Sequence, residues 1–93
     1  MKTLVIYDIT DDRIRNTISE ICKNFGLSRI QKSAFLGSLT SSRRKELSTK
    51  LRNALGSEKG NIQIFVICEA DLSLREIIGE EFKEKEEEGL VVL

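Results

Sequence analysis

The sequence predicts an α+β fold in which two amphipathic helices cover one sheet. Short apolar stretches of strand length alternate with stripes of helical spacing, and such stripes occur at two separate places. The chain has 93 residues, of which 40% are apolar, and this is enough for one domain with a modest core. A chain of this size buries only about 60–65% of the surface that its unfolded form exposes. Association with a second copy would therefore help to stabilise it.

The first half of the chain predicts a strand, a helix and a second extended region. Residues 2–7 are rich in strand formers, and residues 12–25 place apolar side chains on a single helical stripe. Gly26 follows as a left-handed helix stop. Residues 27–39 alternate imperfectly, which predicts two strands joined by a tight turn or one strongly bent strand. Gly37 is interpreted as a small turn residue, with a bulge or a close backbone approach as alternatives.

The second half predicts a further helix and strand. Residues 40–42 supply an N-cap for a helix over residues 43–55. Residues 62–68, IQIFVIC, are apolar on both faces, which predicts a central strand beside the first one. Residues 77–78 suggest one more short strand. With right-handed connections, this order predicts a ferredoxin-like βαββαβ sandwich whose first and last core strands are adjacent and central.

The last residues differ in composition from the rest, so we divide the chain into a domain over residues 1–79 and a tail over residues 80–93. The tail begins with the charged stretch EEFKEKEEE and ends in four apolar residues. Exposed apolar residues at a terminus are prone to aggregate unless they pair with a sheet edge. The tail is therefore expected to be a charged linker followed by an extra strand, paired with a sheet edge of a dimer partner.

Composition excludes several kinds of site. There is no histidine, so a Ser-His-Asp triad, a Cys-His dyad and a His-ligated zinc site are ruled out. No apolar run approaches the length of a transmembrane helix. The first residues form a strand pattern without the regions of a signal peptide, so we expect no signal peptide. Cys22 and Cys68 lie far apart within apolar patterns, which predicts buried free thiols in a cytoplasmic protein.

Opposite charges separate along the chain although the formal net charge is zero. Residues 1–53 carry a net charge of +6 and residues 54–93 a net charge of −6. The basic part could present a phosphate-binding face, or the two parts could neutralise each other in the fold. Arg43 and Arg44 lie in the first turn of the second predicted helix, where they oppose the helix dipole. Their basic face suits nucleic acid or plain solvation equally well.

Asp8 is the first candidate site residue because it ends an apolar strand just before the chain turns. Asp11 and Asp12 follow at the start of the helix, and Arg13 and Arg15 bring cations close to all three carboxylates. A carboxylate at a strand end with cations nearby can place a metal and steer a phosphate. The same pattern also fits an ordinary N-capped helix start, so the spacing alone leaves both interpretations open.

Two motifs occur together in this sequence: Y-D-I-x-D-D-x-x-R from Tyr7 to Arg15, and S-x-F-x-G at Ser33, Phe35 and Gly37. Together they resemble the small CRISPR-associated protein 2 family, the nuclease-like subunit of spacer acquisition. The resemblance extends over roughly residues 4–69. One departure is the stretch Gln31-Lys32-Ser33, where many relatives have Q-Y-S.

This resemblance implies a homodimer with Asp8 of each protomer near the twofold axis. It also implies an endonuclease dependent on Mg²⁺ or Mn²⁺, with Asp8 as catalytic residue and metal ligand, acting on RNA or DNA. Facing carboxylates repel unless a proton or a metal lies between them, so a dimer offers a better metal site than one protomer. The residues that would contact nucleic acid are Arg13, Arg15, Arg29, Lys32, Ser33, Arg43 and Arg44. Tyr7, Phe35 and Gly37 are motif or interface positions. Phe35 is expected to pack in the core or the dimer interface, with stacking on a base as the alternative.

Two other functions remain open at this point. In the first, the chain is a non-catalytic subunit that bridges dimers of the companion CRISPR integrase and holds prespacer duplex DNA through backbone contacts. Asp8 is then structural, and one carboxylate per protomer indeed supplies few groups for catalysis. In the second, the chain is a toxin-like ribonuclease, since small toxin nucleases share the fold.

Overall fold

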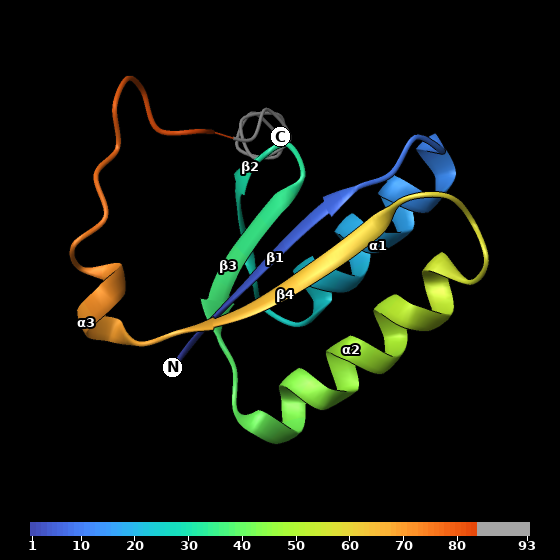
Figure 1. The fold of residues 1–93 in the computed structure, drawn as a ribbon, viewed down its shortest axis with the longest axis horizontal. Coiled ribbons are helices and arrows are strands. Elements are labelled where there is room, and N and C mark those ends of the chain that lie inside the picture. The colour runs from blue at the N-terminus through green and yellow to red at the C-terminus, as the bar shows by residue number, and fades with distance from the viewer. Residues whose placement is uncertain (84–93) are drawn as a thin grey trace, which may run out of the picture.

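The computed structural model describes residues 1–83 and shows a four-stranded antiparallel sheet with both long helices on one side (Figure 1). The strand order is β2-β3-β1-β4. This is the predicted ferredoxin-like α+β sandwich. The elements are β1 (Lys2–Asp8), α1 (Asp12–Asn24), β2 (Ser28–Gln31), β3 (Ala34–Ser38), α2 (Ser41–Leu55), β4 (Asn61–Ile67) and the short α3 (Glu69–Leu72).

The core lies between the helices and the inner face of the sheet. Ile18 of α1 and Leu47 of α2 are fully buried against Val5 of β1 and Phe35 of β3. These residues lie on the helical stripes and alternating strand positions that the sequence predicts. Cys22 is buried as expected, whereas Cys68 is only half-buried at the N-cap of α3.

The extended region after α1 forms two strands, as one of the two expectations had it. β2 and β3 are joined by a turn at Lys32 and Ser33, and β1 anchors this turn because the Tyr7 N–H donates to the Ser33 carbonyl at 3.0 Å. The interpretation of Gly37 as a turn residue was wrong. Gly37 lies inside β3, where a Cβ would stand 2.7 Å from Leu27 Cδ2 and 3.2 Å from Leu27 Cα. Gly37 therefore permits the close approach of two segments.

The prediction that the last strand is central was also wrong. β4 pairs with β1 as expected, but it is an edge strand, and β1 and β3 occupy the centre. The two apolar faces of β4 therefore do not mean that other strands flank it on both edges. Among the described residues, Phe65 points to the sheet face that neither α1 nor α2 covers, and it keeps 43% of its surface exposed.

The expected strand at residues 77–78 is absent from the described part of the chain. Residues 73–83 have no regular structure. The short helix α3 was not predicted; Cys68 caps it by accepting from Asp71 N–H at 3.4 Å. The charged linker and terminal strand fall mostly on residues 84–93, outside the described residues. Within residues 1–83, no helix is both long and apolar enough to span a bilayer.

Candidate functional site

Asp8 is the last residue of β1 and its side chain is exposed. Strand side chains alternate between faces, so Asp8 shares the uncovered sheet face with Leu4 and Ile6, opposite buried Tyr7. Its register partner on β4 is Asn61. Within residues 1–83, its carboxylate makes no hydrogen bond or ion pair, so it remains available to a ligand.

A close backbone contact fixes the chain on either side of this carboxylate. Gly60, just before β4, has φ +122°, and a Cβ there would lie 2.5 Å from the Asp8 carbonyl oxygen. It would also lie 3.2 Å from Ile9 Cα, and Ile9 is itself buried in the core. The position of Asp8 therefore depends on the absence of a side chain at Gly60.

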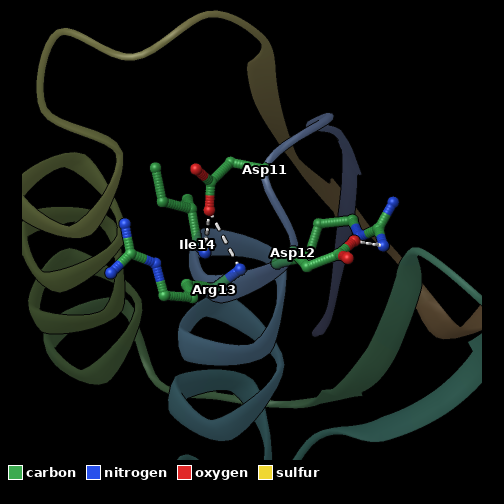
Figure 2. A network of polar contacts seen from close by, with 5 residues as sticks. Asp11, Asp12, Arg13 and Ile14 are labelled. Atoms are coloured by element: carbon green, nitrogen blue, oxygen red, sulfur yellow. Dashed lines mark hydrogen bonds and ion pairs between the residues drawn. The ribbon is translucent and has the colours of Figure 1, made fainter.

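The other two carboxylates of the first motif have structural roles. Asp11 is the N-cap of α1 and accepts from Arg13 N–H at 2.9 Å and from Ile14 N–H at 3.1 Å. Figure 2 shows this carboxylate over the first turn of the helix, with Asp12 to one side of it. The Asp12 carboxylate pairs with the guanidinium of Arg15. The N-cap interpretation is therefore correct for Asp11. Asp8 takes no part in this cap or in the ion pair of Asp12.

One protomer supplies a limited donor set for a hard cation. Among the described residues, no three His, Cys, Asp or Glu side chains gather as a metal cluster. A divalent cation at Asp8 would therefore keep mostly water oxygens or take a second carboxylate from another copy. Asp8 fits such a cation because it is exposed and unpaired, but it does not form a complete site alone.

Four of the predicted nucleic-acid contacts gather in one depression of about 430 Å³ between α1 and the β2–β3 turn. We call it the basic depression. Three of its lining residues, Tyr7, Asn16 and Ser19, were not among the predicted nucleic-acid contacts. Among the described residues, the lining consists of Tyr7, Arg15, Asn16, Ser19, Arg29, Lys32 and Ser33.

Arg29 is held firmly at the wall of the basic depression. Its guanidinium carbon lies 5.0 Å from the centre of the Phe35 ring, a cation–π arrangement. It donates to the Lys32 carbonyl at 3.0 Å and to Ser19 Oγ. Phe35 is fully buried and stacks with Tyr7 at a centroid distance of 6.4 Å, so it packs in the core. Phe35, a residue of the second motif, thus helps to hold Arg29 at the wall of the basic depression.

The remaining basic candidates lie elsewhere. Arg13 lines a different shallow surface with Glu58, and Arg44 is half-buried and makes no hydrogen bond or ion pair within residues 1–83. Arg43 lies over the Phe25 ring at 4.2 Å and pairs with Glu46 at 2.7 Å. Arg43 therefore joins α2 to the end of α1, which explains a cation in this first turn without any ligand.

Sequence reasoning missed Asn16 and Ser19 because they are polar residues that lie off the apolar stripe of α1. Ser19 lies four residues after Arg15 and three after Asn16, so all three share one helix face. That spacing was a usable signal. Gly60 had no such signal, since its role depends on a contact with a strand distant in sequence.

The family model described as CRISPR associated protein Cas2 matches residues 1–75. The chain belongs to the Cas2 family. The resemblance seen in the two motifs is thereby confirmed.

Individual Cas2 relatives cover most of the chain. The CRISPR-associated endoribonuclease Cas2 of Desulforudis audaxviator is 44% identical over 78 residues, which are 84% of this chain and 74% of that protein. A CRISPR-associated endonuclease Cas1/endonuclease Cas2 fusion of Thermoproteus tenax is 38% identical over 77 residues, covering 81% of this chain and 29% of the fusion. The crystal structure of Streptococcus pyogenes Cas2 at pH 6.5 matches with a TM-score of 0.74 at 20% identity, covering 85% of this chain and all (100%) of that one. The last comparison supports the fold alone.

Proposed function

We propose that this Cas2-family protein is a divalent-metal-dependent endonuclease that cleaves phosphodiester bonds in RNA, DNA or both during spacer acquisition. The observation that carries the proposal is the exposed, unpaired carboxylate of Asp8 at the rim of an uncovered apolar sheet face. The endoribonuclease name of the relative from Desulforudis audaxviator supports the same activity.

A homodimer would complete the site. The uncovered face carries Leu4, Ile6 and Phe65, and the latter two are 39% and 43% exposed. An apolar face of this kind favours burial against a partner, and a twofold axis matches the same patch on both copies. Packing there brings a second Asp8 to the first. The terminal residues 89–93 add to a sheet edge of the partner in this proposal, so deleting them should weaken the dimer measured by sedimentation.

Two Asp8 carboxylates and water would hold Mg²⁺ or Mn²⁺ in this arrangement. When bound, such a cation neutralises charge on the scissile phosphate and lowers the pKa of a coordinated water. The chain itself contributes the positioning of the strand. Arg15, Arg29 and Lys32 hold phosphates away from the scissile one, because the basic depression lies on the opposite sheet face from Asp8.

A second candidate is a structural subunit that joins dimers of the Cas1 integrase and holds prespacer duplex DNA. The natural Cas1/Cas2 fusion in Thermoproteus tenax supports a working association of the two proteins. The basic first part of the chain suits phosphate-backbone contacts without sequence readout. The free thiols of Cys22 and Cys68 fit a cytoplasmic setting for either function.

The test compares wild type with Asp8→Asn on labelled RNA and duplex DNA, with Mg²⁺, Mn²⁺ or EDTA. Cleavage that needs metal and disappears in Asp8→Asn, while the dimer persists, supports the nuclease. Equal cleavage by both proteins contradicts it. If neither protein cuts but both bind duplex DNA with steep salt dependence, the structural subunit is the better account.

A further inference from the structure

The negative charge of the second part of the chain is concentrated in one short stretch. Residues 54–79 account for only −2 of its net charge, and residues 80–88 account for the other −4. We call this stretch, EEFKEKEEE, the acidic segment. It is therefore the main block of charge opposite to residues 1–53, which carry +6.

The ion pairs on the two long helices do not cancel the positive charge of residues 1–53. Arg15 pairs with Asp12, and Arg43 pairs with Glu46 at 2.7 Å. Each pair joins opposite charges of the same part of the chain, so the excess of +6 is unchanged by them. Both pairs are exposed, and exposed pairs of this kind contribute little to stability. The first part of the chain therefore still attracts an anionic segment.

The described part of the acidic segment lies beside β2. Residues 73–83 run from α3 to the β2 side of the sheet (Figure 1). Glu80, Glu81 and the half-buried Phe82 line a cavity of about 450 Å³ together with all four residues of β2. Arg29 of β2 lines this cavity and also the basic depression. The acidic segment therefore begins next to the wall of the basic depression.

The rest of the acidic segment is long enough to reach across this wall. An extended chain spans about 3.3–3.6 Å per residue, so residues 84–88 can reach roughly 17 Å beyond Lys83. Four of these five residues are glutamate. Lys32 lines the depression, is exposed, and makes no hydrogen bond or ion pair within residues 1–83. A short tether holds the glutamates near this cation at an effective concentration of about millimolar.

We propose that the acidic segment binds the basic depression of its own chain and competes there with the phosphates of nucleic acid. The proposal rests on the proposed function for the identity of the competing ligand. A glutamate carries one negative charge at neutral pH, so the cations that would hold phosphates also hold the segment. If the depression is open in about one tenth of the molecules, nucleic acid binds about tenfold more weakly.

Binding of a labelled single-stranded RNA, measured by fluorescence anisotropy with EDTA present, tests this competition. The tail variant is the full chain with Glu86→Gln, Glu87→Gln and Glu88→Gln, so that residues 89–93 remain for dimer formation. It should bind the RNA about three- to tenfold more tightly than wild type, because the depression is open in more of the molecules.

The matched control removes three negative charges from other exposed places. None of these three residues lines the basic depression. The control should gain less than about twofold in affinity, because charges far from the bound strand are screened by salt. It carries the substitutions Glu58→Gln, Glu69→Gln and Asp71→Asn.

A second substitution locates the effect in the depression. Lys32→Met is introduced into wild type and into the tail variant, and the gain from the tail substitutions should fall close to one in this background. Lys50→Met removes an exposed cation on α2 outside the depression, and it should leave the gain unchanged even if both affinities fall. Circular dichroism checks that each variant keeps the fold.

Nuclear magnetic resonance of the free protein gives a readout without nucleic acid. The amide signals of Lys32 and Ser33 should shift between wild type and the tail variant and stay in place in the control variant. A chain that binds no nucleic acid would contradict the proposed function, while these shifts still decide whether the segment occupies the depression. Unchanged signals, equal gains in the tail and control variants, or a gain that survives Lys32→Met would each overturn the inference.

Discussion

Gly60→Ala tests whether the loop before β4 holds Asp8 in place. The new methyl group would lie 2.5 Å from the Asp8 carbonyl oxygen, closer than such atoms pack in proteins, and 3.0 Å from Ile9 Cγ1, which is a tight contact. Either β4 or the end of β1 must move to relieve this contact. The Asp8 carboxylate follows because it belongs to the same residue as the displaced carbonyl.

The magnitude has two parts. A non-glycine residue held at φ +122° carries strain of about 1–3 kcal/mol, and overpacking adds about 1–3 kcal/mol. Gly26→Ala is the matched control, since Gly26 has φ +84° but no atom within 4 Å of its Cβ position. The effect of replacing glycine on the unfolded chain is common to both variants. Gly60→Ala should therefore lose about 1–3 kcal/mol more unfolding free energy than Gly26→Ala.

The assay is urea unfolding at one fixed protomer concentration, because formation of the proposed dimer would make stability depend on concentration. Cleavage of labelled RNA is measured on the same samples under conditions where both variants are folded. We expect Gly60→Ala to lose cleavage while Gly26→Ala retains it. Equal unfolding free energies and equal cleavage in the two variants would refute the idea that Gly60 positions Asp8.

Two further predictions concern stability. Asp11→Ala removes the N-cap of α1 and should lower the unfolding free energy by about 1 kcal/mol. Asp12→Ala removes an exposed ion pair and should change the unfolding free energy by less than about 0.5 kcal/mol. Urea unfolding compares the two variants, and equal losses would contradict the assignment of Asp11 as the cap. Burial raises the pKa of Cys22 from 9.0 to about 12, so the folded chain keeps a proton that the unfolded chain loses between these values. Stability should therefore decline as the pH rises from 9 towards 12, and an equally steep decline in Cys22→Ala would count against this cause.

Local patterns predicted the elements well because they depend on residues near in sequence. The apolar stripe of α1, its cap at Asp11 and the strand ending at Asp8 are all properties of one segment. Placement within the sheet was predicted less well. A strand can be apolar on both faces because it is central or because one face packs against a partner. The composition of β4 therefore could not distinguish an edge strand from a central strand.

The candidate site shows the same division. The motifs identified Asp8, Arg15 and Ser33 from their positions along the chain. Their separation onto opposite faces of the sheet depends on the parity of Tyr7 and Asp8 and on the turn that Tyr7 anchors. The structural role of Arg43 could not be predicted, because its partner Phe25 lies at the C-cap of α1, distant in sequence.

The most direct test of the central claim asks whether the two Asp8 carboxylates of a dimer act together. Wild-type and Asp8→Asn chains with different tags are coexpressed, and the mixed dimer is purified through both tags. A shared site requires both carboxylates, so the mixed dimer should cleave RNA no faster than the doubly substituted dimer. Cleavage at about half the wild-type rate would show that each protomer acts alone and would contradict the account.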